Sequence, residues 1–469
     1  MKLSSSFLDY YRCPEQYVDF RLIGAIHEGQ ETGYFRFGPD VVCYGRCVTT
    51  RVSADLSSQC ADSRPDAYVR GSRCMLPFDP TEIVDNLRRE RYVAAAPSSG
   101  ARSFIRRAYY QVRPYLPVSV RKHLQRLWLN GKSKRSFPSW PVDCTVDRFL
   151  RTIMSLCVQG SGTPSIPFIW FWPDGKSSAA IVTHDVEASS GLTFCDQLMN
   201  VNDSFGIKAS FQIIPEMRYA ASDEILSAMR RRGHEINVHD LKHDGYLFSE
   251  RDSFLKSAQR INAYAEQFKA KGFRSGVLYR NVEWYDAFSF SYDMSVPNTA
   301  CMDPQPGGCC TVMPYFIGAI LEIPVTTTQD YSIFHILGSY SIDLWLEQIE
   351  VIMGHHGLIS FIVHPDYLQT NRAMSTYKSL LRHLAGLRST SELWMALPGE
   401  IDSWWRERNQ MRLVWKDARW VIEGAGADRA RIAYAILEDG RLRYSFEEPN
   451  EAERAGFETS PGHRLSQAL

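Results

Sequence analysis

Short apolar runs alternate with longer amphipathic ones between residues 167 and 408, and this pattern constrains the fold more than any other feature of the chain. The short runs have the length and composition of buried strands, whereas the longer ones carry apolar residues at helical spacing. The strand-like runs are residues 179–183, 208–215, 234–239, 318–325 and 358–364. The helix-like runs are residues 223–232, 253–271, 341–353 and 376–387. Such alternation predicts an α/β fold in which helices wrap a parallel sheet, either a barrel or a doubly wound sheet.

The remainder of the 469-residue chain divides into three further parts by composition. Residues 1–90 mix short β-prone runs with turn residues and predict a small α+β N-terminal domain of unknown role. Residues 91–166 predict a basic linker with helices, because residues 102–135 contain ten Lys or Arg and no acidic residue. The alternating region is placed at residues 167–410. The runs in residues 411–469 are typical of antiparallel strands and predict a short β-rich C-terminal appendix.

The basic segment at residues 102–135 allows two interpretations. Its apolar residues recur as in an amphipathic helix, which could bring its lysines and arginines against an anionic membrane surface or a lipid phosphate. The alternative, which we favour, is a linker helix with a solvated basic face. The whole chain has 53 Lys plus Arg and 53 Asp plus Glu, so its charge gives no reason to expect nucleic-acid binding.

Three features of the sequence predict a cytoplasmic location. The first 20 residues have no apolar core of the length that a secretory signal needs. No stretch of about 18 apolar residues is present that could span a membrane. The 11 cysteines are an odd number scattered along the chain, which suits reduced thiols better than a disulfide framework. If the basic segment binds a membrane, we expect it to be peripheral to the inner face.

The run AAIVT leads directly into two acidic side chains, Asp185 and Glu187. Side chains alternate across a strand, so Thr183, Asp185 and Glu187 are predicted to share one face while His184 points to the other. Two carboxylates this close repel each other, and the pair therefore needs a nearby cation or a catalytic use. The simpler alternative is a strand end with two solvated acids.

His239 ends the strand-like run at residues 234–239, and His243 lies four residues further on. In a helical turn this spacing places both imidazoles on one face, where they can bind one metal ion. For the motif taken alone, two surface histidines are the alternative. Together with an upstream carboxylate, however, two histidines form a ligand set typical of zinc. Three protein ligands leave a position for water, which is the arrangement of a catalytic site.

A third polar strand end is His364, which follows the apolar run LISFIV and precedes a proline. Active sites of α/β barrels form at the carboxyl ends of the strands, so the three polar strand ends are predicted to lie on one rim. Histidine titrates in the range that a general acid needs. The alternative is a histidine that caps a strand through backbone hydrogen bonds.

Taken in order, the motifs THDVE, GHEINVHDLKHDGY, GFRSG, TTTQDY and FIVHP resemble those of the polysaccharide deacetylase family, the NodB-type carbohydrate esterases. The resemblance covers about residues 177–408, roughly half of the chain. It implies a distorted (β/α) barrel, a divalent metal, with Zn²⁺ as the expected ion, and hydrolysis of a linear amide that is not a peptide bond. The leading substrate is an N-acetylated amino sugar in a polysaccharide or a lipid-linked glycan.

The resemblance also implies a role for the residues at the first strand ends. Asp185 corresponds to the general base, and Arg274 of GFRSG to the arginine that orients it. Glu187, His239 and His243 correspond to the metal ligands. In many members of the family the carboxylate ligand is an aspartate, so the glutamate is a departure from the common pattern.

On the acid side, the resemblance implies that His364 protonates the leaving nitrogen and that Asp330 keeps this histidine protonated. A backbone amide near Tyr279 would help to stabilise the oxyanion. We also expect the rings of Tyr279 and Trp284 to offer faces on which the sugar substrate could stack, with core packing as the alternative. Gly276 stands where the family usually has a proline.

Two alternative functions fit the same motifs. One keeps the barrel and the metal but hydrolyses another carbon–nitrogen bond, as a deformylase acting on a lipid- or nucleotide-linked substrate would. The other is a degenerate family member that binds a glycan without catalysis, which the departures at Glu187 and Gly276 would favour. The retained base, histidines, arginine and acid argue against it, because a binding module has no need of an acid and a base together.

Overall fold

The structure, a computed structural model, describes residues 3, 5–56, 59–94, 137–390 and 392–448. The basic segment at residues 102–135 lies outside these residues, so both of its interpretations stay predictions. Within the part of the chain that is described, no helix is long and apolar enough to cross a lipid bilayer.

The chain forms two compact units, each assembled from separate segments. Unit 1 comprises Met1–Val84, Arg148–Gly175 and Glu407–Leu469. Unit 2 comprises Asp85–Asp147 and Lys176–Arg406. Segments from both ends of the sequence thus belong to one unit, whereas the sequence analysis assigns them to separate domains.

Unit 2 is built on a curled sheet of nine strands. The hydrogen-bonded order is β12-β13-β11-β10-β9-β8-β7-β14, and β15 also pairs with β7. All pairings are parallel except that of β12 with β13. The strands are β7 (Ser178–Val186), β8 (Ser210–Ile213), β9 (Glu235–His239), β10 (Gly272–Arg274), β11 (Tyr292–Asp293), β12 (Tyr315–Ile317), β13 (Ile320–Glu322), β14 (Leu358–Ile362) and β15 (Leu393–Met395). The predicted α/β class is confirmed, and each of the five predicted strand runs contains a strand.

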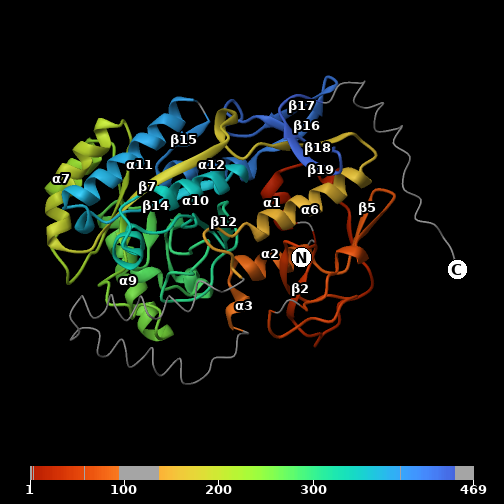
Figure 1. Cartoon of the computed structure of the whole chain (residues 1–469), viewed down its shortest axis with the longest axis horizontal. Helices are drawn as coiled ribbons and strands as arrows, with labels where there is room; N and C mark the ends of the chain where they lie inside the picture. The colour runs from red at the N-terminus through yellow and green to blue at the C-terminus, as the bar shows by residue number, and fades with distance from the viewer. Residues whose placement is uncertain (1–2, 4, 57–58, 95–136, 391, 449–469) are drawn as a thin grey trace. The chain divides into compact units, whose positions relative to one another are not determined.

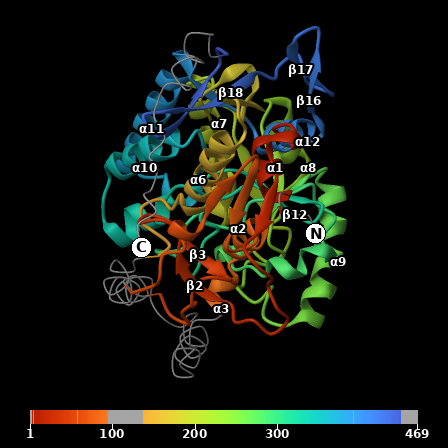
Figure 2. The ribbon, with the colours of Figure 1, turned by 90° about the vertical axis from the view of Figure 1, so that its right-hand side faces the viewer.

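Helices connect many of these strands along the sequence. They are α7 (Ser189–Ser204), α8 (Asp223–Arg231), α9 (Arg251–Gln267), α10 (Asp343–Gly354) and α11 (Asn371–Ser389). Helices α10 and α11 lie side by side in both views of the ribbon (Figure 1, Figure 2). The four predicted helices correspond to α8, α9, α10 and α11, whereas α7 is not predicted.

Helix α8 shows how local sequence sets the limits of an element. The Ser222 side chain accepts a hydrogen bond from the N–H of Ile225 at the first turn. Acidic residues occupy that turn, and Arg230 and Arg231 occupy the last one, which suits the helix dipole at both ends. Gly233 follows with a φ of 78° and lets the chain turn back toward β9.

The core of unit 2 lies between the sheet and its helices. Every residue of β7 is buried, because this strand is central in the sheet and is covered on both faces. Its sequence therefore reads as an almost continuous apolar run until its carboxyl end. There, and at the ends of β9 and β14, the apolar residues give way to acidic and histidine side chains. Since these strands run parallel in one sheet, with β8 between β7 and β9, the three polar ends lie on one rim.

Unit 1 contains small sheets whose strands pair antiparallel, apart from the parallel pairing of β1 with β5. Strand β16 (Arg412–Lys416) pairs with β17 (Arg419–Glu423), while β18 (Ile432–Glu438) pairs with both β19 (Arg441–Ser445) and β6 (Ser165–Ile169). The antiparallel strands predicted after residue 411 are thus confirmed. The remaining strands are β1 (Phe20–Leu22), β2 (Gly33–Arg36), β3 (Val42–Gly45), β4 (Tyr68–Arg70) and β5 (Arg73–Leu76), and the first helix is α1 (Ser5–Tyr11).

Candidate metal and catalytic site

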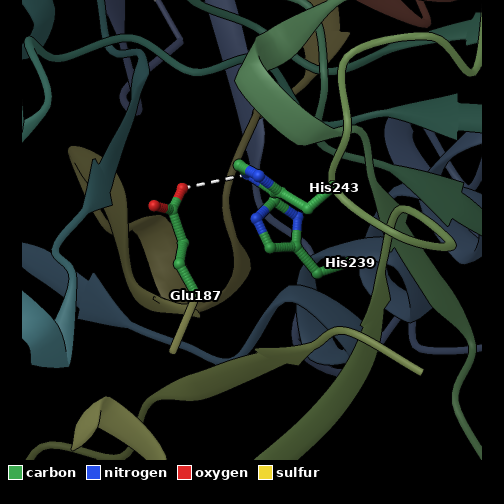
Figure 3. A group of neighbouring side chains, drawn as sticks. All are labelled: Glu187, His239 and His243. Atoms are coloured by element: carbon green, nitrogen blue, oxygen red, sulfur yellow. Dashed lines mark ion pairs between the residues drawn. The ribbon is translucent and has the colours of Figure 1, made fainter. Parts of the chain in front are cut away.

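Three side chains of unit 2 come together where β7 and β9 end: Glu187, His239 and His243. One nitrogen or oxygen atom of each lies within 4.8 Å of those of the other two. Figure 3 shows the carboxylate and the two imidazole rings facing one another, with Glu187 Oε1 2.9 Å from His243 Nε2. Both histidines are buried, and the Glu187 side chain is 26% exposed. These three residues, which the sequence predicts as ligands, could hold a metal ion.

The turn after β9 brings the two histidines together without a helix. His239 is the last residue of β9, and Asp240 and His243 both adopt positive φ angles, of 57° and 54°. The Asp240 carboxylate fixes this turn by accepting hydrogen bonds from the N–H groups of Leu241 (2.6 Å) and Gly276 (3.0 Å). The predicted helical turn is therefore wrong. Two left-handed residues replace it, and they bring the imidazole centroids to 4.8 Å.

The hydrogen bonds of the histidines leave nitrogen atoms that suit a metal ion. His239 Nδ1 lies 3.1 Å from the carbonyl oxygen of Arg274, which can only accept, so Nδ1 carries the proton. The Nε2 atoms of both histidines are buried: that of His239 makes no hydrogen bond to any residue that the structure describes, and that of His243 faces the Glu187 carboxylate. Two such nitrogens beside the Glu187 carboxylate match the ligand preference of zinc and related ions. The residues present therefore fit the group that the motifs imply.

Asp366 fixes the strand end that carries Glu187. Its Oδ2 accepts a hydrogen bond from the Glu187 N–H (3.1 Å), and its Oδ1 accepts one from the Ser190 hydroxyl (3.0 Å). A Cβ atom at Gly191 would lie 2.4 Å from the same carboxylate, so the close approach requires glycine. The sequence analysis missed Asp366. Its only signal is its place two residues after His364, which gains meaning once β14 is known to pair with β7.

Asp185, near the end of β7, is held by Arg274 at the end of β10. Arg274 Nη1 donates hydrogen bonds to Asp185 Oδ1 (2.7 Å) and Thr183 Oγ1 (2.6 Å), and its Nε donates to the carbonyl of Met294 (3.0 Å). Burial by itself raises the pKa of Asp185, but the charges of Arg274 and of nearby histidines outweigh it and hold the pKa below its ordinary value. Asp185 is therefore a carboxylate, with Oδ2 3.8 Å from His239 Nε2.

His364 follows β14 and is oriented by Asp330. Its Nδ1 lies 2.6 Å from Asp330 Oδ1, and the other oxygen of this carboxylate accepts the backbone N–H of His364 at 2.8 Å. Burial by itself lowers the pKa of His364, but the charges of Asp330 and Glu187 raise it well above its ordinary value. Its Nε2 faces the possible metal ligands, 3.6 Å from Glu187 Oε1. The structure thus contains the predicted pairing of the two residues.

His184 points away from this group, as the predicted alternation of β7 requires. Its Nδ1 lies 3.0 Å from the carbonyl of Val363, and its Nε2 lies 3.0 Å from the side-chain nitrogen of Asn202. Burial lowers the pKa of His184 to about 3, so the ring is neutral. Thr183 and Asp185, on the other face, both contact Arg274. His184 is therefore a core histidine with satisfied hydrogen bonds.

Gly276 is explained by the turn that carries His243. A Cβ atom at this position would lie 2.5 Å from Asp240 Oδ2 and 3.0 Å from His243 Cδ2. The Gly276 N–H also donates to the Asp240 carboxylate, and a proline has no N–H to offer. The departure from the usual proline therefore matches the packing of this particular turn.

The two aromatic residues predicted to bind the substrate have different surroundings. Tyr279 is half-buried and lies beside the loop after β9, where a Cβ atom at Gly245 would lie 3.4 Å from its ring. Trp284 packs against Phe254, with ring centroids 5.3 Å apart, and borders the apolar core of unit 2. This is the core packing that the sequence analysis gives as the alternative. A role in substrate binding stays a prediction for both residues.

Several solved proteins are similar in structure to about half of the chain. A protein from Mycobacterium smegmatis assigned as a polysaccharide deacetylase is 20% identical, with 51% of this chain and 93% of that chain covered and a TM-score of 0.41. The allantoinase Puue is 15% identical, with 50% of this chain and 92% of that chain covered and a TM-score of 0.40. A protein from Pseudomonas aeruginosa PAO1 assigned as a polysaccharide deacetylase is 16% identical, with coverages of 50% and 93% and a TM-score of 0.38.

No family model and no curated protein matches the chain. Polysaccharide deacetylases, the family that the sequence motifs resemble, are thus among the structurally similar proteins.

Proposed function

We propose that the protein is a metal-dependent hydrolase that removes the acetyl group from an N-acetylated amino sugar. The observation that carries this proposal is a carboxylate and a histidine, each held by its own partner, that lie beside two of the three possible ligand residues. Asp185 Oδ2 lies 3.8 Å from His239 Nε2, and His364 Nε2 lies 3.6 Å from Glu187 Oε1. A base and an acid at one buried metal site support hydrolysis, because a site that only binds its ligand needs neither.

Asp185 is placed to accept the proton of the attacking water. Its Oδ1 is hydrogen-bonded to Arg274, so Oδ2, which faces His239, receives the proton. Because Arg274 holds the pKa of Asp185 low, this carboxylate is a weak base and can only deprotonate a water that is more acidic than bulk water. A divalent cation held by Glu187, His239 and His243 would supply that acidity and would polarise the amide carbonyl.

His364 is placed to protonate the leaving nitrogen. Asp330 accepts from Nδ1, which fixes the ring and leaves the Nε2 proton facing the site. The raised pKa keeps the imidazole charged near neutral pH. As the water oxygen bonds to the acyl carbon and the carbon–nitrogen bond breaks, Asp185 takes one proton and His364 gives one to the nitrogen. The products are acetate and a free amine.

The proposed substrate class comes from the five motifs and from the low solvent exposure of the site. The side chains of Asp185 and His364 are 5% and 4% exposed, so the acyl group would react at groups that are largely shielded from water. There, the charges act with less screening than in water. An acetamido group on a sugar is small enough to reach such a position, while the rest of the glycan stays outside.

The test combines metal content with acetate release. We expect the purified protein to contain about one divalent ion per chain and to release acetate from oligosaccharides of N-acetylglucosamine. Asp185→Asn should keep the ion and lose at least about 100-fold in rate, because the amide cannot accept the proton. The matched control is Asp252→Asn, which changes an exposed aspartate in the first turn of α9 and should leave the rate unchanged.

Other outcomes would separate the alternatives. A bound ion with release of formate, and not acetate, would favour hydrolysis of a formamide. Absence of both ion and product in the wild-type protein would overturn the proposal and leave a glycan-binding protein as the better explanation.

A further inference from the structure

The peptide unit that joins Val363 to His364 is hydrogen-bonded on both sides. Its N–H, which belongs to His364, donates to Asp330 Oδ2 at 2.8 Å. Its carbonyl oxygen, which belongs to Val363, lies 3.0 Å from His184 Nδ1. A carbonyl oxygen can only accept, so Nδ1 of His184 carries the proton and donates it. Two buried side chains, Asp330 and His184, therefore hold the peptide unit that precedes the proposed acid.

His184 is also the acceptor of a chain of hydrogen bonds that begins on the outer helices. Because Nδ1 carries the proton, Nε2 accepts from the side-chain N–H of Asn202 on α7, 3.0 Å away. Asn202 Oδ1 in turn accepts from the hydroxyl of Tyr377 on α11 at 2.6 Å. Burial lowers the pKa of His184 to about 3, so the ring stays neutral and Nε2 stays an acceptor. The chain thus runs from α11 through α7 and His184 to the end of β14.

This chain is fully buried and has a use other than stability. The side chains of His184, Asn202 and Tyr377 are all 0% exposed, and the His184 ring packs against Phe211, with centroids 5.0 Å apart. Apolar side chains of similar volume would fill the same space without the cost of burying polar groups. A buried network whose members are all hydrogen-bonded instead fixes one arrangement of the elements that it joins.

The arrangement fixed here is that of the proposed acid relative to the proposed base. On β7, Thr183 accepts the backbone N–H of Val363 at 3.0 Å, and the next residue, His184, binds the carbonyl of Val363. Asp185 directly follows His184, and His364 directly follows Val363. The two proton-transfer groups therefore lie one residue beyond the two ends of a single hydrogen bond. His184 itself points to the other face of β7, so it acts on the site through the backbone and not by contact.

We propose that His184 is a positioning residue, which fixes His364 by holding the carbonyl of the peptide unit that joins Val363 to it. Asp330 holds the N–H of that unit and the imidazole, so the two side chains together set where His364 Nε2 meets the leaving nitrogen. The inference rests on the proposed function for the role of His364 as the acid. A displacement of about 1 Å at a proton donor can cost on the order of 100-fold in rate.

The first part of the test measures acetate release from oligosaccharides of N-acetylglucosamine. His184→Phe keeps the ring volume but removes the donor, and we expect kcat to fall about 10- to 100-fold with KM unchanged. In His184→Asn the amide nitrogen is bonded to Cγ, as Nδ1 is, so the donor to Val363 remains and kcat should stay within about threefold of the wild type. Both variants should lower the free energy of unfolding, so a role in stability alone predicts a loss of rate in both.

His234→Phe is the matched control. This second histidine is 4% exposed and also contacts Phe211, with ring centroids 5.5 Å apart, but it precedes β9 at the end of the strand opposite to the rim. The substitution should lower the free energy of unfolding and leave kcat unchanged.

The second part of the test does not need turnover. Hydrogen exchange of the His364 backbone N–H is measured by NMR in the wild type and the variants, with the buried amides of α10 as the reference. We expect exchange at His364 to be at least about tenfold faster in His184→Phe, and unchanged in His184→Asn and in His234→Phe.

The outcomes separate this proposal from the proposed function. A loss of kcat in His184→Phe that His184→Asn restores, with faster exchange at His364 in the first variant alone, would support the positioning role. An unchanged kcat in His184→Phe, or equal losses in the two variants, would refute it and leave the function intact. A wild-type protein that releases no acetate would refute the function. In that case, faster exchange in His184→Phe alone would still support the hold on His364, and an unchanged exchange rate would overturn it.

Discussion

Replacing Arg274 by methionine removes the cation that compensates the buried carboxylate of Asp185. The two side chains are 0% and 5% exposed, so the aspartate cannot recover its hydration without a rearrangement of the rim. Removing one partner of such a pair costs about 3–5 kcal/mol, and the lost hydrogen bonds to Thr183 and Met294 add about 1 kcal/mol. We therefore expect Arg274→Met to lower the free energy of unfolding by about 4–6 kcal/mol at pH 7.

This loss should depend on pH, because most of it comes from the charge on Asp185. In the wild type the pKa of Asp185 lies below its ordinary value, so the pair stabilises the fold above the unfolded-state pKa of about 3.9 and loses that contribution as the pH falls. In Arg274→Met, burial acts without the compensating cation and raises the pKa of Asp185. The variant then takes up a proton when it folds in acid. As the pH falls, its deficit in the free energy of unfolding relative to the wild type therefore shrinks by at most about 1.4 kcal/mol per pH unit.

Urea unfolding of metal-free protein at pH 7 and pH 5 measures this change directly. Asp185→Asn and the double variant complete the comparison. Once residue 185 is uncharged, Arg274→Met should lower the free energy of unfolding by less, and by the same amount at both pH values. An equal deficit for Arg274→Met at pH 7 and pH 5 in the wild-type background would refute the reasoning. So would an unchanged deficit in the Asp185→Asn background.

Three further changes test other parts of the site. Asp330→Asn should move the alkaline limb of the pH–activity profile about 1–3 pH units lower, since the raised pKa of His364 depends on that charge; an unmoved limb would contradict the pairing. Gly276→Ala should destabilise the fold by about 1–3 kcal/mol in thermal unfolding, because its Cβ would meet a carboxylate oxygen at 2.5 Å. Its control, Gly386→Ala on α11, should stabilise by up to about 1 kcal/mol because no atom lies within 4 Å of the new Cβ, and equal effects would refute the packing explanation. Asp366→Ala should weaken metal binding about 10- to 100-fold in a chelator competition, and unchanged affinity would exclude a positioning role.

The parts of the fold that the sequence predicts are those with a strong local pattern. The alternation in β7 places Thr183 and Asp185 on the face opposite to His184, and the structure has the same arrangement. Long strands and amphipathic helices are also predicted correctly, because their apolar residues recur with a clear period. Strands of two or three residues, such as β10 and β11, carry no detectable period, and the mixed composition of α7 hides its buried face.

The parts of the site that local pattern cannot reach depend on contacts between distant residues. The sequence gives no physical reason to join Arg274 to Asp185, which lie 89 residues apart, so that pairing comes from the family resemblance alone. The role of Asp366 depends on the pairing of β14 with β7. The turn at Asp240 is misread as helical, because non-glycine residues with positive φ are rare. The Gly276 N–H, which donates to the Asp240 carboxylate in this turn, is 36 residues away in the sequence.

The divided path of unit 1 has a consequence for how the protein is made. Strand β6 finds its partner in β18, with Ile169 opposite Ile432, and the hydroxyl of Tyr11 meets that of Tyr444 at 2.8 Å. A ribosome that has released β6 must therefore add the whole of residues 176–406, on the order of tens of seconds of synthesis, before the partner strand exists. The continuous stretch that carries the rim of histidines and carboxylates leaves the ribosome first. The residues of the site are thus synthesised while the edge of β6 is still without its partner strand. This unpaired edge is where a chaperone or a misfolded neighbour would bind.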